Sequence, residues 1–212
     1  MRDITDLVQG YKQFLEEEYP KQADLYRTLA EEGQTPKTMV IACCDSRADP
    51  GVIFNAGPGE IFVVRNVANL VPPYEPHGDY HGTSAALEFA VNGLNVETIL
   101  VMGHARCGGI HAFLSGLNKP ADQAGFIDHW MSLLKPTLND VMKLKRNKSK
   151  EELQRAVEHT SIRHSLENLM TFPWIRERVA DGRLQLRGAY FDIADATLLA
   201  LNPDSGCFEP LN

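Results

Sequence analysis

The sequence predicts an α/β fold, in which a mostly parallel central β-sheet is flanked by helices and followed by a C-terminal antiparallel strand and hairpin. Two observations lead to this prediction. Short apolar runs typical of strands buried on both faces alternate with helix-like segments, and the chain closes on an alternating strand and a turn signal. The composition, 43% hydrophobic and 23% charged over 212 residues, is typical of a soluble globular protein. We therefore expect a single domain, residues 1–212, in which an N-terminal helical arm (1–32) precedes an α/β core (36–212).

The first half of the chain supplies the arm and three strands. Apolar residues at helical spacing predict an amphipathic helix close to the N-terminus and a second helix that ends before Gly33. Apolar runs predict strands at 38–44, 61–66 and 98–103. A helix is expected at 82–94, with Thr83 or Ser84 as its N-cap and Gly93 near its end.

The second half supplies a long helix and the end of the sheet. The basic run at 143–150 lies between two helix-like segments and is expected to be a solvated loop. Ser149 and Glu152 predict a capping box for a helix that should run to about Met170. The alternation over 183–193 predicts a strand, and "NPDSG" predicts the turn of a terminal hairpin.

Charge and hydropathy argue against several classes of protein. The formal net charge of −7 argues against a nucleic-acid-binding protein, which normally carries a basic excess. No stretch of the sequence approaches the roughly 18 apolar residues that a membrane helix needs, and the N-terminus lacks the apolar core of a signal peptide. We therefore expect a cytoplasmic protein, in which reduced cysteines favour a metal or catalytic role over disulfides.

Two unusual motifs fall at the carboxyl ends of predicted strands, where open α/β sheets bind their ligands. "CCDSR" ends the first predicted strand, and "GHARCGG" ends the third one and leads into another helix. Side chains alternate in direction along an extended segment, so Cys43, Asp45 and Arg47 should face the cleft together. Cys44 should point the other way and serve as a small apolar filler.

Cys43, His104 and Cys107 together offer two thiolates and an imidazole, which are ligand types of a zinc site. Three such ligands leave a fourth tetrahedral position, as in catalytic zinc sites, and Asp45 is the nearest candidate to fill it or to orient a water there. Each motif alone is weak evidence, because a histidine or cysteine can simply belong to the core. A redox pair is disfavoured because adjacent Cys43 and Cys44 form no CxxC motif. A phosphate-binding loop is disfavoured because the glycine pattern differs from that of nucleotide sites.

The same motifs resemble those of a known family, the β-class carbonic anhydrases. "CCDSR" fits the CxDSR motif of that family and "GHARCGG" fits its HxxCGG motif, and the resemblance is close over residues 30–115. It implies one Zn²⁺ per chain, held by Cys43, His104 and Cys107, and the reversible hydration of CO2 to bicarbonate and a proton. It also implies a homodimer or a higher homo-oligomer, with each cleft near a subunit interface and the N-terminal helix embracing a neighbouring subunit.

The resemblance is to the plant-like branch of the family. It also implies roles for further residues. Zinc lowers the pKa of a bound water so that hydroxide can attack CO2. Two thiolates should leave that water less acidic than three histidines would, so turnover should rise from about pH 7 toward pH 9. Asp45 would accept the hydrogen bond of the hydroxide, and Arg47 would hold Asp45 by a bidentate contact. The residues implied to bind substrate are Gln34, Phe62, Val67, Phe89 and Gly108, although the branch often has tyrosine at the position of Phe89.

Three alternatives stay open beside this interpretation. The protein could be a non-catalytic zinc protein that Asp45 closes permanently, or a relative that acts on CS2 or COS with the same ligands. It could also be a binding module for acidic or nucleotide ligands, which zinc analysis would test. His77 and His81 are candidates for a proton shuttle, although a solvated loop is the simpler interpretation of both histidines.

We expect an open metal site, in which the fourth zinc position holds water, hydroxide or a small ligand, rather than a closed site in which Asp45 binds the zinc. In one branch of the family, closure by the aspartate accompanies a bicarbonate pocket built from a tryptophan, an arginine and a tyrosine. The corresponding residues of this chain are Val40, Arg65 and Phe191, so two of the three polar contacts are missing. Because burying an anion beside apolar walls is costly, we expect Asp45 to pair with Arg47 at neutral pH.

Overall fold

The computed structural model describes residues 3–77, 81–117, 124–145 and 149–211. The chain divides into two compact units, Met1–Thr35 and Pro36–Asn212. No helix among the described residues is both long enough and apolar enough to cross a membrane.

The N-terminal unit is a helical arm. Its helices are α1 (Ile4–Gln13) and α2 (Tyr19–Glu32), joined by a π-helical turn at Phe14–Glu18. Asp3 caps the start of α1 through its side chain, and Gly33 ends α2 with a φ of 84°, which glycine adopts without strain. No residue of these helices, all of which the structure describes, is buried within the chain. The two helices that the apolar spacing predicts are therefore present, as one almost continuous helical segment.

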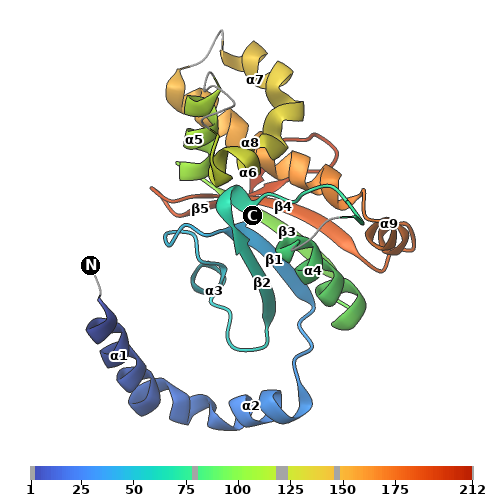
Figure 1. The fold of residues 1–212 in the computed structure, drawn as a ribbon. Coiled ribbons are helices and arrows are strands. Elements are labelled where there is room, and N and C mark those ends of the chain that lie inside the picture. The colour runs from blue at the N-terminus through green and yellow to red at the C-terminus, as the bar shows by residue number, and fades with distance from the viewer. Residues whose placement is uncertain (1–2, 78–80, 118–123, 146–148, 212) are drawn as a thin grey trace. The chain divides into compact units, whose positions relative to one another are not determined.

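The second unit is built on a six-stranded sheet with the strand order β2-β1-β3-β4-β5-β6 (Figure 1). The strands are β1 (Thr38–Cys43), β2 (Ile61–Asn66), β3 (Thr98–His104), β4 (Gln185–Asp192), β5 (Thr197–Leu201) and β6 (Phe208–Pro210). The first four strands run parallel to one another, whereas β5 pairs antiparallel with β4 and β6 pairs antiparallel with β5. The predicted parallel sheet and its antiparallel C-terminal hairpin are confirmed.

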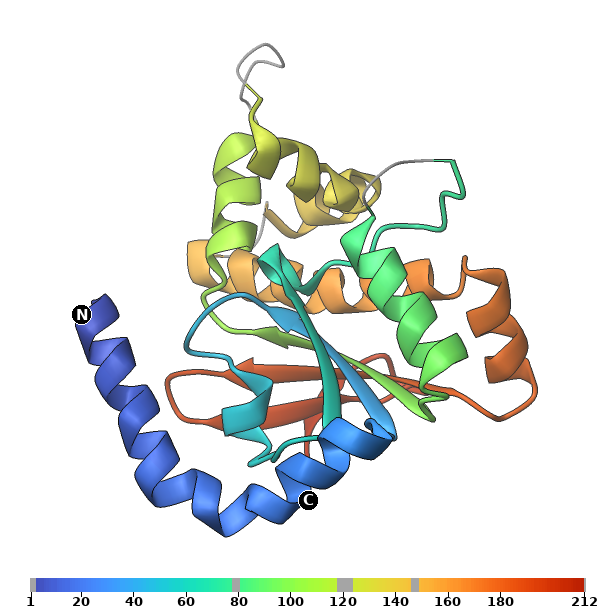
Figure 2. The ribbon, with the colours of Figure 1, turned by 60° about the horizontal axis from the view of Figure 1, so that its bottom comes forward.

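Helices cover this sheet, as Figures 1 and 2 show. They are α3 (Pro50–Ile53), α4 (Gly82–Glu88), α5 (Gly108–Gly116), α6 (Phe126–Met131), α7 (Leu138–Lys145), α8 (Lys150–Leu169) and α9 (Pro173–Ala180). Met39 and Ile41 of β1 pack in the same core cluster as residues of α4, α8 and α9. Val40 and Ala42 belong to a second, smaller cluster that includes Ile53 of α3. Strand β1 is therefore buried on both faces, which explains its uninterrupted apolar sequence.

The observed helix boundaries match the predicted ones at some helix ends and differ from them at others. The capping box of Ser149 and Glu152 is present at the start of α8. The N-cap of α4 is His81, without a side-chain hydrogen bond, so the prediction of Thr83 or Ser84 as the cap is wrong. Thr83 is instead turned inward, where its hydroxyl accepts a hydrogen bond from Asn66 Nδ2 at 3.3 Å. A loop is expected at 143–150, but α7 continues to Lys145 and α8 begins at Lys150. Residues 146–148 of this run lie outside the described residues.

Candidate metal centre

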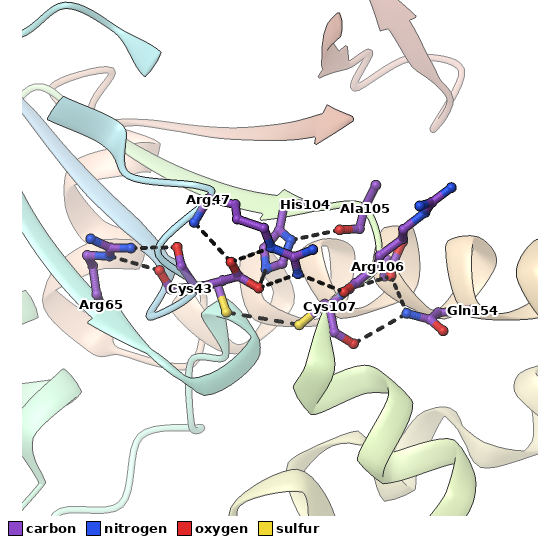
Figure 3. Close-up of polar contacts among 10 residues, drawn as sticks. Cys43, Arg47, Arg65, His104, Ala105, Arg106, Cys107 and Gln154 are labelled. Carbon is purple, nitrogen blue, oxygen red and sulfur yellow. Dashed lines mark hydrogen bonds and ion pairs between the residues drawn. The ribbon is translucent and has the colours of Figure 1, made fainter. Parts of the chain in front are cut away.

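The structure brings together three residues that the sequence selects as metal ligands, because two neighbouring strands end beside each other. Cys43 is the last residue of β1 and His104 the last of β3, and the two strands are paired in parallel. Cys107 follows as the N-cap of α5. The ligand atoms of the three residues all lie within 4.8 Å of one another, and the two sulfur atoms are 4.0 Å apart (Figure 3). All three residues are buried, with exposed fractions of 6%, 1% and 1%.

The turn between His104 and Cys107 depends on an unusual backbone conformation. Ala105 N–H donates to the carbonyl of Phe191, which extends the pairing of β3 with β4 by one hydrogen bond. Arg106 then adopts a φ of 56°, in the left-handed region that residues other than glycine seldom occupy. This reversal of direction places Cys107 back beside Cys43 within three residues of His104.

The donor set fits a zinc ion. Two sulfur atoms about 2.3 Å from a tetrahedral zinc lie about 3.8 Å from each other, close to the 4.0 Å between Cys43 and Cys107. His104 Nδ1 lies 2.9 Å from the carbonyl oxygen of Ala105, so Nδ1 carries the proton and donates it there. The lone pair of Nε2 is then free, and among the described residues this buried atom has no hydrogen-bond partner.

The two thiols also depend on each other for their protonation. A hydrogen bond from Cys107 lowers the pKa of Cys43 below its ordinary value. The same hydrogen bond to Cys43, reinforced by burial, raises the pKa of Cys107. Two thiolates this close repel each other in a buried site, and a bound dication would remove that repulsion.

Asp45 and Arg47 form the predicted ion pair beside the three ligands. Arg47 donates from Nε to Asp45 Oδ1 at 2.9 Å and from Nη2 to Oδ2 at 2.7 Å, and its backbone N–H donates to Oδ1 at 3.0 Å. These contacts, the guanidinium hydrogen bonds first, hold the pKa of Asp45 well below its ordinary value. Asp45 Oδ2 lies 3.9 Å from His104 Nε2, and Arg47 Nη2 reaches the carbonyl of Arg106 at 3.4 Å. The carboxylate is therefore ionised and held at the edge of the ligand group.

Arg65 of β2 fixes the loop that carries Asp45 (Figure 3). Its Nε donates to the carbonyl of Cys43 at 2.9 Å and its Nη2 to the carbonyl of Asp45 at 2.7 Å. Its Nη1 forms an ion pair with Asp49. Three of the five N–H groups of the guanidinium are thus bonded within this chain, which leaves fewer of them to bind a free anion.

The exposure of Cys44 contradicts one prediction from the sequence. Cys44 is exposed, so its description as an apolar filler of the core is wrong. Strand β1 ends at Cys43, and Cys44 lines a cavity of about 770 Å³. His81, half-buried, lines the same cavity, whereas His77 is exposed and is not among its lining residues.

Of the residues implied to bind substrate, Val67 and Gly108 lie beside the candidate ligands Cys43 and Cys107. Val67 packs in the same cluster as Cys43 and Cys107. Gly108 is the first residue of α5, directly after Cys107. Phe62 packs against the other core cluster and lies against Phe89, with ring centroids 5.7 Å apart, while Phe89 is 54% exposed. Gln34 is exposed and belongs to the N-terminal unit.

Sequence reasoning missed two residues of α8 that contact Cys107, one of the three candidate ligands. Glu158 accepts a hydrogen bond from the backbone N–H of Cys107, and Gln154 donates one to its carbonyl. No local motif links them to Cys107, because they follow it by 51 and 47 residues. A signal was available nonetheless: Glu158 shares helical spacing with Ser161 and Ile162, and it is thus a charged residue on the buried face of its helix.

Comparison with known proteins identifies the family. A family model described as carbonic anhydrase matches residues 38–198. The chloroplastic β carbonic anhydrase 5 of Arabidopsis thaliana is 42% identical over 194 residues, which are 92% of this chain and 63% of that protein. The chain thus spans less than two thirds of the length of this relative.

Solved structures agree with this result. The β-carbonic anhydrase CcaA superimposes with a TM-score of 0.91 at 30% identity, over 99% of this chain and 92% of that one. A structure reported for two tetrameric β-carbonic anhydrases of the ascomycete Sordaria macrospora gives a TM-score of 0.80 at 28% identity, over 95% of this chain and 96% of that one. Since the family model covers most of the α/β unit and these relatives share nearly the whole fold, the chain belongs to the carbonic anhydrase family, and within it to the β class.

Proposed function

We propose that the protein catalyses the reversible hydration of CO2 to bicarbonate and a proton, with one zinc ion per chain. The observation that carries this proposal is the buried group of Cys43, His104 and Cys107, with the ionised carboxylate of Asp45 3.9 Å from His104 Nε2. The carbonic anhydrase names of the relatives support the same reaction.

The chain supplies the zinc ligands and a fixed acceptor beside them. Cys43, His104 and Cys107 would hold the zinc ion, which when bound is a Lewis acid that makes water nucleophilic near neutral pH. Asp45 would accept a hydrogen bond from the reacting water and thereby orient a lone pair toward CO2. Because Arg47 contacts both oxygens of Asp45, the carboxylate keeps its charge and its direction throughout the reaction.

The substrate side of the site would combine an apolar wall with a backbone donor. Val67 packs beside the ligand cysteines and would contact CO2, which is apolar. Gly108 stands at the start of α5, where a backbone N–H has no acceptor inside the helix and could bind a substrate oxygen. Phe62, Phe89 and Gln34 would contribute only to a pocket that is completed across a subunit interface.

An open site is supported over one that Asp45 closes. Three hydrogen bonds hold Asp45 to Arg47, and closure would have to break them. Val40 is buried in β1 and Phe191 is half-buried in β4, so neither offers a polar group to an anion. Arg65 is already bonded to the loop of Cys43 and Asp45.

A homo-oligomer and a cytoplasmic location complete the proposal. The arm exposes apolar side chains that its own unit does not cover, and a second copy of the chain would bury them; they are Ile4, Leu7, Val8, Tyr11, Leu15 and Leu25. The tetrameric relatives of Sordaria macrospora support this assembly. Location stays a prediction from the sequence, because a chloroplastic relative is also among the matches.

Stopped-flow measurement of CO2 hydration, combined with zinc analysis of the purified protein, tests the proposed function. We expect close to one zinc per chain and a rate that is lost when a chelator removes the metal. CS2 and COS offered as alternative substrates test the related hydrolase activity in the same preparation. Stoichiometric zinc without CO2 hydration would refute the proposed reaction, and the absence of zinc would refute the proposed site.

A further inference from the structure

A buried carboxylate lies directly behind the proposed metal site. Glu158 is on α8, and only 3% of the residue is exposed. Its Oε1 accepts hydrogen bonds from the backbone N–H of Cys107 at 2.9 Å and from Gln154 Nε2 at 3.0 Å. Its Oε2 accepts a hydrogen bond from the Tyr190 hydroxyl at 2.8 Å. Both carboxylate oxygens are therefore satisfied, by donors from α8, from β4 and from the metal-binding turn.

Burying this carboxylate is costly unless its contacts compensate for the lost hydration. Among the described residues, no lysine, arginine or histidine forms an ion pair with Glu158. Its three neutral donors carry the whole compensation, and one of them is the peptide N–H of Cys107. The position of Cys107 and the position of Glu158 thus depend on each other.

The backbone of Cys107 is held from both sides by α8. Its N–H is bound by Glu158, and its carbonyl accepts a hydrogen bond from Gln154 Nε2 at 3.3 Å (Figure 3). Gln154 also bonds Glu158, so the two helix residues act as one clamp. Cys107 is the N-cap of α5 but forms no side-chain cap, and its sulfur instead faces Cys43 at 4.0 Å. Because both the N–H and the carbonyl of Cys107 are bonded, only the rotation of its side chain remains to be set.

We propose that Glu158 is a positioning residue for the metal site: it holds the peptide of Cys107 so that the thiolate points at the metal. This inference rests on the proposed function, because it takes Cys107 as a zinc ligand. Residues that orient metal ligands typically contribute about 10- to 100-fold to metal affinity. Glu158 performs this role on the backbone of a ligand rather than on its side chain.

Three substitutions of Glu158 separate the hydrogen bond from the charge. E158M removes the acceptor and leaves the N–H of Cys107 unpaired. E158D keeps the charge but withdraws the carboxylate by one methylene. E158Q removes the charge but keeps an acceptor for the N–H. Glu151, which is exposed on the first turn of the same helix, provides the control E151M.

The measurement is zinc affinity, obtained for folded metal-free protein by competition with a chromophoric chelator. The absorption spectrum of the Co²⁺-loaded protein serves as a second readout, because its ligand-field and thiolate-to-cobalt bands report the geometry of the ligands. We expect E158M to bind zinc about 10- to 100-fold more weakly, with a shifted cobalt spectrum. E158D should show a smaller loss in the same direction. E158Q should stay within about threefold of the wild type, and E151M should equal it.

The outcomes distinguish this inference from the function on which it rests. A wild-type protein that binds no zinc would overturn both. Wild-type zinc binding with unchanged affinity and cobalt spectra in E158M and E158D would overturn the positioning role alone, and E158D decides the question if E158M does not fold. An equal loss in E158Q and E158M would also overturn it, because charge rather than the hydrogen bond would then be responsible.

Discussion

Replacing Gly109 by alanine should destabilise the protein, although the residue lies in a helix where alanine is normally preferred. A Cβ atom at this position would lie 2.7 Å from Val67 Cγ1, 3.1 Å from Ala68 Cβ and 3.4 Å from Met131 Sδ. Ala68 and Met131 are buried, so these neighbours have little room to move. Overpacking of this kind costs about 1–3 kcal/mol, and the better helix propensity of alanine returns up to about 1 kcal/mol.

The adjacent glycine provides a matched control for stability. A Cβ at Gly108 would meet nothing within 4 Å, so G108A keeps the gain in helix propensity without the clash. For a chain of this size, 1 kcal/mol corresponds to about 2–4 °C in Tm. With an overpacking cost of about 2 kcal/mol and a propensity gain of about 1 kcal/mol, the net loss is about 1 kcal/mol. We therefore expect G109A to melt about 2–4 °C below the wild type and G108A to melt at or slightly above it.

Differential scanning calorimetry at one fixed protein concentration is the appropriate assay, because the Tm of an oligomer depends on concentration. Zinc content should be matched between variants, since bound metal also raises the Tm. Equal Tm values for G109A and G108A would refute the packing argument. They would mean that Val67 and Met131 move aside at no cost.

Three further predictions concern the site itself. Cys43→Ser should lose zinc and CO2 hydration together, whereas Cys44→Ser should keep both because Cys44 is exposed and lies outside the group of candidate ligands. Loss of stoichiometric zinc from Cys44→Ser would contradict this assignment. Arg47→Met should lower stability at about pH 7, because Arg47 holds the pKa of Asp45 below its ordinary 3.8. Such a carboxylate stabilises the fold above its ordinary pKa and loses that effect as the pH falls, so the difference in denaturant midpoint between variant and wild type should shrink below about pH 4. The rate of CO2 hydration should rise between about pH 7 and pH 9, because two thiolate ligands weaken the metal as an acid; a flat profile in stopped-flow assays would contradict this ligand set.

The sequence by itself predicted the sheet and selected the three candidate metal ligands. Uninterrupted apolar runs are required of strands that are buried on both faces, and β1 and β3 are such strands. Parallel neighbouring strands end at the same edge of a sheet, so Cys43 and His104 had to meet. The Asp45–Arg47 pair could also be predicted from the sequence, because its two partners are only two positions apart.

Only the tertiary structure decided what surrounds these ligands. Cys44 is exposed because β1 ends one residue earlier, and the position of a strand end depends on the partner strand rather than on local sequence. Phe62 and Phe89 pair with each other away from the ligand cysteines, which no spacing in the sequence expresses. Glu158 reaches the peptide of Cys107 only because α8 packs against β3 and β4 and thereby lies beside the start of α5. Such contacts join segments far apart in the chain, and the packing of helix on sheet sets them.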